Sequence, residues 1–378
     1  MTSADSTYLD LPFTRESASR WDVDPKVFAN WRWQIKHQIR TLEDAEKFII
    51  LSEDERIGFE KSQKLFNSGV TPYYAALMAP DPTVSCPIRL QANPRVQELV
   101  DEIGEKDPLL EKPHSPVPEV VQVYPDRVAF CVAQLCPVYC RYCFRKRRDD
   151  EDGLHFNRKI IEAGVEYIRS QPAIKDVLIT GGDPFVASDG ALENLLVSLR
   201  EIKHVEMIRF GTRTPVTLPY RITDDLCKML SKFHPIWVNT HFNCVQEITE
   251  EAAAAAHKLT MHGIPVSNQS VLLKGINDDR DSQLALLRGL LRIRVRPYYL
   301  FHPHKVEGTA HLRVPLLEGL KLMRSLRGNI TGLAIPNYVL DTPSGKIPLE
   351  HNYKLSFDGP DLVIEDVRGE IWREKDVL

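Results

Sequence analysis

The sequence predicts an α/β protein with a parallel, barrel-like sheet, a helical N-terminal region and a short C-terminal extension. From about residue 127 onward, short β-rich runs alternate with segments whose apolar residues recur at spacings of three and four. This alternation is typical of βαβ units, and six or so units favour a partial (β/α)6-type barrel, although a doubly wound sheet would give a similar pattern. The predicted strands are 127–135, 176–180, 205–211, 236–241, 264–273, 295–301 and 333–339, and the predicted helices are 158–171, 191–203, 224–233, 247–262 and 281–292.

The residues before the first predicted strand differ in texture. Segments 24–50 and 53–66 carry apolar residues at helical spacing among charges, and a proline-rich passage at 109–118 is typical of a linker. We therefore expect a helical N-terminal region with its linker at 1–118, a barrel at 119–345 and a C-terminal extension at 346–378.

Composition narrows the class of protein. The net charge of −4 gives no reason to expect a nucleic-acid or membrane partner, and residues 1–15 contain no apolar run, so we expect a cytoplasmic protein. The odd count of seven cysteines argues against a disulfide framework. Four of them are isolated in the sequence and are expected to be small buried side chains: Cys86, Cys131, Cys227 and Cys244.

The other three cysteines form the strongest motif. Cys136, Cys140 and Cys143 directly follow the first predicted strand, and chemistry in parallel α/β folds collects at the carboxyl ends of strands. Thiolates at these spacings can converge on one soft metal centre. Zinc sites and ordinary iron–sulfur clusters normally use four ligands, so three thiolates would leave one iron open to a chelating substrate. A zinc knuckle with a distant fourth ligand is the alternative.

This motif resembles the radical S-adenosylmethionine superfamily, and the residues around it resemble the lysine 2,3-aminomutase family within it. The similarity covers residues 71 to 353. It is carried by Tyr124-Pro-Asp-Arg-Val, Cys140-Arg-Tyr-Cys-Phe-Arg145, Gly181-Gly-Asp-Pro184, Gly211-Thr-Arg-Thr-Pro215, Asn239-Thr-His-Phe-Asn243, Asn268-Gln-Ser-Val-Leu-Leu and Arg296-Pro-Tyr-Tyr299.

The resemblance implies a [4Fe–4S] cluster on the three cysteines, with S-adenosylmethionine chelated by the open iron and cleaved to a 5′-deoxyadenosyl radical. It also implies that the turn Gly181-Gly182-Asp183 meets the methionine amino group, and that His241 and Gln269 line the same site. Glycines permit close backbone approach, and a carboxylate can accept from an ammonium.

The resemblance further implies pyridoxal 5′-phosphate. Lys346, in Asp341-Thr-Pro-Ser-Gly-Lys346, matches the family lysine that forms a Schiff base with it, although the turn here is two residues shorter. Tyr124 and Arg127 match residues that contact the cofactor ring and phosphate. A second phosphate-binding arginine of the family is replaced by Val123.

The substrate is then an amino acid whose α-amino group moves to Cβ. The resemblance implies that Arg145 binds the α-carboxylate, a task that suits a bidentate guanidinium. We interpret the following basic residues 146–148 as a surface run. Lysine-specific relatives bind the distal ammonium with two aspartates, of which Asp341 is retained here and the other is replaced by His304. L-Lysine is the expected substrate, with arginine, glutamate or another amino acid as alternatives.

Other expectations concern metals, partners and rival activities. Zinc is not expected, because Asp279 stands where longer relatives have a zinc cysteine and no cysteine follows Cys244. We expect a homo-oligomer and an electron donor such as flavodoxin or ferredoxin. The rivals are a radical enzyme with the same cofactors but another outcome, and an iron–sulfur electron carrier or sensor.

Overall fold

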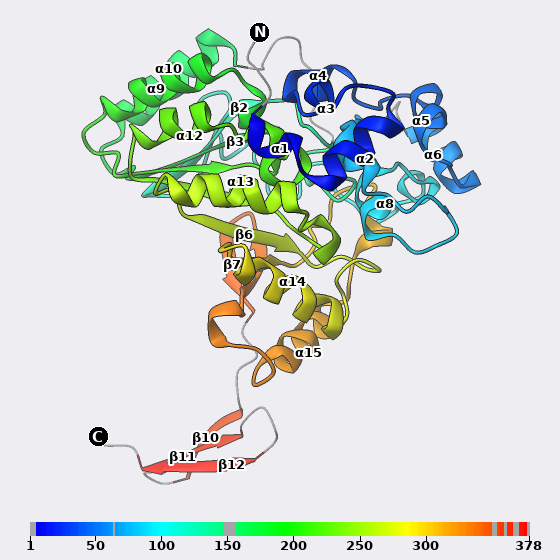
Figure 1. Ribbon diagram of the computed structural model, residues 1–378. Coiled ribbons are helices and arrows are strands. Elements are labelled where there is room, and N and C mark those ends of the chain that lie inside the picture. Colours follow the sequence, from blue (N-terminus) through cyan, green and yellow to red (C-terminus); the bar gives the residue numbers. More distant parts are fainter. Residues whose placement is uncertain are drawn as a thin grey trace.

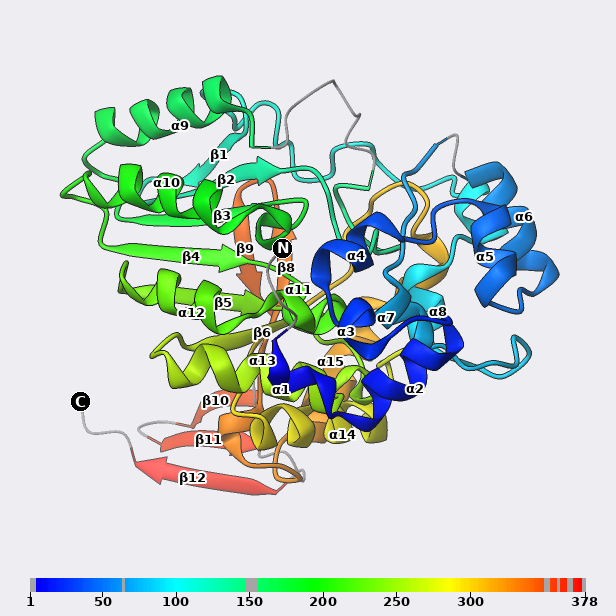
Figure 2. The same cartoon turned by 45° about the horizontal axis from the view of Figure 1, so that its top comes forward.

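The computed structural model describes residues 5–62, 65–146, 156–349, 354–358, 361–365 and 370–375. Its centre is one nine-stranded sheet in which the strands follow one another in chain order, curled into a nearly closed barrel (Figures 1 and 2). The strands are β1 (Val120–Tyr124), β2 (Arg127–Ala133), β3 (Asp176–Gly181), β4 (Met207–Gly211), β5 (Ile236–Thr240), β6 (Val266–Val271), β7 (Arg296–Phe301), β8 (Asn337–Thr342) and β9 (Gly345–Pro348). Strands β2 to β8 run parallel, while β1 and β9 pair antiparallel at the two edges. The predicted fold class is confirmed, but β1 and β9 were not expected.

Helices cover the outside of the barrel. They are α9 (Arg158–Ser170), α10 (Asp189–Arg200), α12 (Asp224–Ser231), α13 (Glu250–Met261), α14 (Arg280–Arg292) and α15 (Leu316–Leu326). The first five each begin after a small polar residue whose side chain accepts a backbone N–H of the first turn: Asn157, Ser188, Thr223, Thr249 and Asp279. These caps explain why the predicted helices form where they do. Only α15 was missed.

Alternate side chains along each strand face either the hydrophobic core under the helices or the interior of the barrel. In β3, Val177 and Ile179 are fully buried in the core, whereas Asp176, Leu178 and Thr180 line a central cavity. Successive side chains of a strand point to opposite faces of the sheet, so one face packs under the helices and the other faces the barrel axis. The polar positions in these otherwise apolar strands therefore mark the interior.

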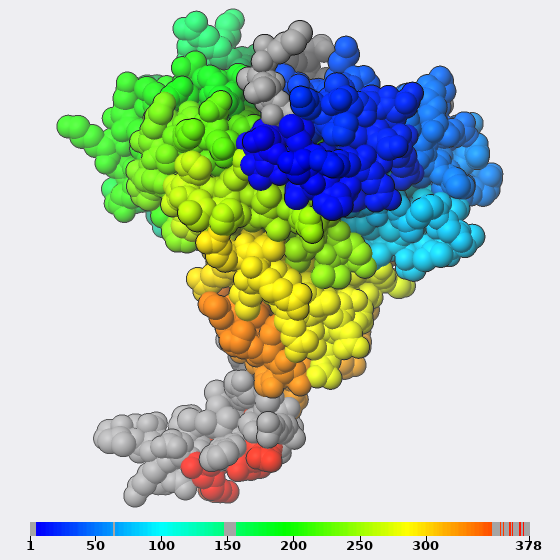
Figure 3. Space-filling model, in the orientation of Figure 1, coloured from blue at the N-terminus to red at the C-terminus, as the bar shows by residue number. Residues whose placement is uncertain are grey.

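The N-terminal region is helical, as predicted, but built from short pieces. These are α1 (Ser6–Leu9), α2 (Pro12–Arg20), α3 (Pro25–Phe28), α4 (Trp31–Lys36), α5 (Leu42–Phe48), α6 (Glu53–Ser62), α7 (Pro72–Ala76) and α8 (Pro87–Ala92). New N-caps at Asn30 and Thr41 interrupt the apolar pattern that predicted helix throughout 24–50. The region packs on the barrel, where Tyr8 Oη donates to the carbonyl of Ile222 at 2.9 Å. Its blue surface is continuous with the green surface of the barrel in Figure 3.

We call residues 98–111 the strap. This segment begins within the last turn of the short helix η1 (Val96–Leu99). The sequence predicted an irregular linker around 109–118, but the strap is bonded to the loop after β7. Asp101 Oδ2 accepts the backbone N–H groups of Thr309 and Ala310 at 3.0 and 3.1 Å. The backbone N–H of Glu105 donates to the carbonyl of Lys305 at 2.7 Å. The strap therefore holds the loop that carries His304.

The C-terminal extension contributes to two sheets. Strand β9 joins the barrel sheet, whereas β10 (Lys354–Asp358), β11 (Asp361–Glu365) and β12 (Ile371–Lys375) form a separate antiparallel sheet (Figure 1). The expected boundaries at 118 and 345 stay predictions. None of the helices in the described ranges combines the length and apolar character needed to span a bilayer.

Candidate active site

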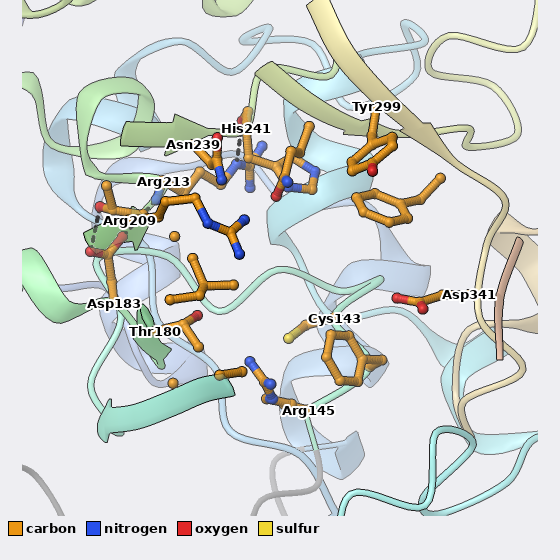
Figure 4. Close-up of a pocket in the computed structure, with 18 of the residues that line it drawn as sticks. Cys143, Arg145, Thr180, Asp183, Arg209, Arg213, Asn239, His241, Tyr299 and Asp341 are labelled. Atoms are coloured by element: carbon orange, nitrogen blue, oxygen red, sulfur yellow. Dashed lines mark hydrogen bonds between the residues drawn. The ribbon is translucent and has the colours of Figure 1, made fainter. Parts of the chain in front are cut away.

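The barrel encloses a cavity of about 780 Å³. Figure 4 shows that its lining side chains come from opposite walls and point toward a common centre. Every residue that the sequence assigned to a site lines this one cavity: Tyr124, Arg127, Cys136, Cys140, Cys143, Arg145, Gly181, Gly182, Asp183, His241, Gln269, His304, Asp341 and Lys346. The fold thus brings together residues that are spread over more than half of the chain.

The three motif cysteines lie on the loop after β2. Gln38 Nε2 fixes the start of this loop by donating to the carbonyl of Cys136 at 2.7 Å. Burial, followed by the charges of Asp183 and the other two thiols, raises the pKa of Cys136 well above its usual value. Among the described residues, no three His, Cys, Asp or Glu side chains are gathered as a metal site, so the thiols share one wall without converging.

The two glycines after β3 allow a close backbone approach to the segment that leads into the cysteine loop. Gly181 has a φ of +124°, and a Cβ on it would lie 2.3 Å from the carbonyl oxygen of Ala133. A Cβ on Gly182 would lie 2.5 Å from the carbonyl carbon of Gln134. Any other residue at either position would push this turn away from the cysteine loop.

Asp183 is buried and bonded within the turn. Its Oδ1 accepts from Thr212 Oγ1 at 2.6 Å and from the N–H of Phe185 at 3.1 Å, and its Oδ2 accepts from the N–H of Arg213 at 2.8 Å. Burial raises the pKa of this carboxyl, and the hydrogen bonds oppose the rise. That the turn Gly181-Gly182-Asp183 contacts a methionine amino group stays a prediction.

His241 and Gln269 lie on neighbouring strands of the same wall. His241 follows β5 and stacks on Tyr142, with ring centroids 5.4 Å apart. Burial and the nearby Arg213 lower the pKa of His241 to about 3, so the imidazole is neutral at pH 7. Gln269 lies at an irregularity in the pairing of β6 with β7. Both side chains offer neutral polar contacts to a ligand.

Arg213 was quoted in a motif but was not recognised as a site residue. It follows β4, lines the cavity, and its Nη1 lies 2.8 Å from Cys140 Sγ. The available signal was an arginine that follows a predicted strand. The sequence does not show that this arginine contacts Cys140.

Arg145 is paired with Glu111 of the strap, a residue that the sequence did not single out. Arg145 Nε donates to both carboxylate oxygens of Glu111, at 2.9 and 3.1 Å, and Nη2 also donates to this carboxylate. Both side chains are largely buried, and both line the cavity. Arg145 Nη1 makes no hydrogen bond to any described residue. One edge of the guanidinium is thereby fixed and another is left for a ligand.

Lys346, at the start of β9, lies against Tyr124 of β1. Its backbone N–H donates to Tyr124 Oη at 2.7 Å. Gly345 has a φ of +115°, and a Cβ there would lie 2.6 Å from the same oxygen, so glycine lets the chain pass over the tyrosine. The guanidinium of Arg127 covers the Tyr124 ring at 3.7 Å. A lysine, a tyrosine and an arginine thus form one corner of the cavity.

Asp341 on β8 lies between Lys346 and His304. Its Oδ2 is 3.4 Å from Lys346 Nζ and 3.7 Å from His304 Nε2. Burial raises the pKa of Asp341, but His304 and Lys346 outweigh burial and hold it below its usual value. His304 Nε2 is buried and has no hydrogen bond to any residue in the described ranges. The ring of Phe144 lies 4.9 Å from that imidazole.

The basic residues after Arg145 require a correction. Lys146 was expected on the surface, but it is buried, and its Nζ donates to Glu98 at 3.1 Å and to the carbonyl of Gly308 at 3.0 Å. It ties the cysteine loop to the strap and to the loop after β7. Arg147 and Arg148 lie outside the described residues. The four isolated cysteines are buried and free, as predicted.

Comparison with known proteins supports the same assignment. The Radical SAM superfamily model matches residues 131–286. The chain is 46% identical over 346 residues to L-lysine 2,3-aminomutase of Bacillus subtilis (strain 168), covering 91% of this chain and 73% of the relative. It is 44% identical over 356 residues to a putative L-lysine 2,3-aminomutase of Aquifex aeolicus (strain VF5), covering 93% and 95%.

A glutamate-specific name is also found among the relatives. Glutamate 2,3-aminomutase of Clostridioides difficile (strain 630) is 41% identical over 337 residues, covering 89% of this chain and 79% of the relative. Radical S-adenosylmethionine family membership implies a [4Fe–4S] cluster and S-adenosylmethionine as cofactors. The resemblance seen in the sequence is confirmed: the chain belongs to the lysine 2,3-aminomutase family of radical S-adenosylmethionine enzymes, and it is an isomerase of the aminomutase type.

Proposed function

We propose that this enzyme is a pyridoxal phosphate-dependent 2,3-aminomutase whose substrate is L-lysine. The observation that carries the proposal is the position of Asp341. Its buried carboxylate lies 3.4 Å from the ammonium of Lys346, in the cavity that also holds Arg145. If Lys346 gives up its charge to a cofactor, Asp341 is left without its cation. The distal ammonium of lysine would replace that cation with no net change in buried charge.

The cysteine loop suits the cluster that the family implies. Thiolates are the ligands of iron–sulfur clusters, and three of them line one cavity wall. Burial, followed by the charges of Asp183 and the two other thiols, raises the pKa of Cys136, and a positive metal centre would favour its thiolate. We infer that Cys136, Cys140 and Cys143 hold the cluster. When bound, the cluster and S-adenosylmethionine supply a radical that removes a hydrogen atom from the substrate.

The corner of Lys346, Tyr124 and Arg127 suits pyridoxal phosphate. The corner offers an amine for covalent attachment, a ring for stacking and a cation for a phosphate. Gly345 keeps the lysine close to the tyrosine, because any Cβ there would collide with Tyr124 Oη. When bound, the cofactor supplies a conjugated ring that delocalises an unpaired electron.

The protein then binds both ends of the substrate. We infer that Arg145 receives the α-carboxylate through Nη1, because Glu111 holds its Nε and Nη2. Asp341 accepts from the distal ammonium, and the imidazole of His304 lies beside it, with Nε2 3.7 Å from Asp341 Oδ2. Fixing both ends places Cβ at one position and limits the access of water to it.

Two observations bear on the alternatives. Lys305, which could attract a substrate side-chain carboxylate, is exposed and does not line the cavity, while Asp341 would repel one, so glutamate is disfavoured. Arginine is the second candidate. Its guanidinium could pair with Asp341 and lie against the rings of Phe144 and His304, which are 4.9 Å apart. The electron donor, the homo-oligomer and the cytoplasmic location stay predictions.

The test is anaerobic incubation of the reconstituted enzyme with S-adenosylmethionine, pyridoxal phosphate, dithionite and separate amino acids. We expect β-lysine from L-lysine, with slower or no rearrangement of arginine and glutamate. β-Arginine as the main product would transfer the proposal to the second candidate. If 5′-deoxyadenosine accumulates while no amino acid rearranges, the proposed function is wrong.

A further inference from the structure

The contact between Arg213 and Cys140 is unusual because it brings a buried cation to a cysteine sulfur. Arg213 Nη1 lies 2.8 Å from Cys140 Sγ, and the arginine side chain is only 10% exposed. Figure 4 shows the guanidinium extending from the β4 wall toward the middle of the cavity. Burying a guanidinium is costly unless it is fully bonded, so its position needs a reason.

The rest of the guanidinium is held by four groups from different parts of the chain. Nη2 lies within hydrogen-bond distance of three acceptors, Tyr74 Oη at 3.1 Å, Gln91 Oε1 at 2.6 Å and Glu247 Oε1 at 2.5 Å, which share its two N–H groups. Nε donates to the carbonyl of His241 at 3.1 Å. These contacts leave the guanidinium little freedom to turn, so Nη1 is fixed against the sulfur.

The Glu247 carboxylate accepts hydrogen bonds from other donors besides Arg213. Its Oε2 accepts the backbone N–H groups of Asn243 and Cys244 at 2.6 and 3.0 Å, and its Oε1 accepts from Tyr74 Oη at 2.6 Å. The carboxylate is therefore already satisfied as an acceptor. Arg213 adds the positive charge that pairs with this buried carboxylate and, through Nη1, a donor directed at Cys140.

Arg209, on the strand β4 that leads to Arg213, offers a comparison. It also lines the cavity, and its Nε donates to Asp176 Oδ1 at 2.8 Å. No hydrogen bond joins Arg209 to a cysteine within the described residues. Of these two cavity arginines, only Arg213 lies against the cysteine loop.

We propose that Arg213 is a positioning residue for the cluster: it holds the Cys140 thiolate and raises the reduction potential of the iron–sulfur centre. One electron from the reductant adds a negative charge to the cluster. A cation that donates a hydrogen bond to one of the cluster's sulfur ligands favours that reduced state, and such hydrogen bonds are among the factors that set cluster potentials. The inference rests on the cluster that family membership implies, and not on the identity of the amino-acid substrate.

The test compares wild type, R213K and R213Q after anaerobic reconstitution. Each protein is titrated with dithionite in the presence of redox mediators, and the electron paramagnetic resonance signal of the reduced cluster is followed against potential. The midpoint is expected to move to more negative values in the order wild type, R213K, R213Q. Lysine keeps the charge but is shorter and lacks the second fork of donors, so R213K should fall between the other two.

R209Q is the matched control, because it removes a cavity arginine from β4, the strand that leads to Arg213, without touching a cysteine, and its midpoint should equal that of wild type. Iron and sulfide content and a thermal melt establish that each variant is folded and loaded. If R213Q takes up no cluster while R209Q does, the holding role is supported, and R213K alone decides the shift in potential. Equal midpoints in fully loaded wild type and Arg213 variants would overturn the proposal. Absence of iron from wild type would instead refute the cluster assignment.

Discussion

Two pairs of residues on facing walls of the cavity are bonded in opposite ways. On the wall that carries the cysteines, Asp183 accepts hydrogen bonds at 2.6, 2.8 and 3.1 Å, and Arg213 uses all three of its nitrogens. On the facing wall, Asp341 lies 3.4 Å from Lys346 and 3.7 Å from His304, and His304 Nε2 has no hydrogen bond to the residues described. Asp183 and Arg213 are thus satisfied by the protein itself, whereas Asp341 and His304 have hydrogen-bonding capacity to spare.

This difference follows from what each wall is proposed to bind. Groups that act in the same way in every turnover gain from being held rigidly in place before the ligand arrives. Groups that meet the variable end of a substrate must leave donors or acceptors unused, at a cost in stability, until the substrate supplies the partner. Changes in the cysteine wall should therefore abolish a step, whereas changes in the facing wall should shift affinities.

Removing a thiol gives the largest expected effect. In C143A the loop keeps only two cysteines in the cavity, and iron content and dithionite-dependent cleavage of S-adenosylmethionine should both be lost. Iron analysis and chromatography of 5′-deoxyadenosine measure this. C227A, which removes a buried cysteine from α12 outside the cavity, should retain both properties. A C143A protein with wild-type iron content would refute the assignment of the cluster.

Removing the Lys346 amine should abolish attachment of pyridoxal phosphate and leave the iron–sulfur cluster in place. In K346A we expect the visible absorbance of protein-bound pyridoxal phosphate to disappear and rearrangement to fall by at least about 10²-fold, the lower end of what a positioned catalytic group contributes. Iron content should not change, because Lys346 does not contact the cysteine wall in the described structure. K305A, at an exposed position outside the cavity, is the control. Wild-type absorbance in K346A would show that the cofactor is attached elsewhere.

The sequence was informative wherever a local rule applied. Strand periodicity predicted β2 to β8, and the tendency of chemistry to follow strands singled out the cysteine loop, which lines the cavity. The resemblance to the family added Asp183 and His241, which line the same cavity. The short edge strands β1 and β9 were missed. Pro116 and Pro118 disguise the start of β1, and β9 is only four residues long beside a turn.

Pairs of charges that are distant in the sequence could not be predicted. Glu111 and Arg145 are 34 positions apart, Glu98 and Lys146 are 48 apart, and neither carboxylate belongs to a recognisable motif. A hydrogen-bond partner supplied by tertiary packing leaves no periodic signal in the chain. For the same reason, a buried lysine cannot be distinguished from a surface lysine within a basic run, which explains the error over Lys146.

Substitution of Glu111 tests whether the strap orients Arg145 before the substrate binds. A hydrogen bond to a charged group contributes about 1.5–3 kcal/mol, and 1.4 kcal/mol is a factor of ten in affinity. E111Q should therefore raise KM for the amino acid about tenfold, with a smaller effect on kcat, because the guanidinium of Arg145 is less firmly oriented. E102Q, an exposed change in the same strap, should leave both unchanged. A fall in KM would mean instead that Glu111 competes with the substrate carboxylate for Arg145.

Substitution of His304 gives the smallest expected change in KM. It tests directly whether the unused hydrogen-bonding groups beside Asp341 bind the substrate. H304D would place a second carboxylate beside Asp341, and a net contribution of about 1 kcal/mol from one further hydrogen bond corresponds to a roughly fivefold lower KM for lysine. Two neighbouring carboxylates raise the pKa of one of them, so the gain should grow as pH rises through that raised pKa. K305Q also makes the local charge more negative, but outside the cavity, and it should not reproduce the effect. An unchanged KM for lysine together with a higher KM for arginine would show that the imidazole serves as a surface for stacking, and that this wall selects its substrate by shape and not by charge.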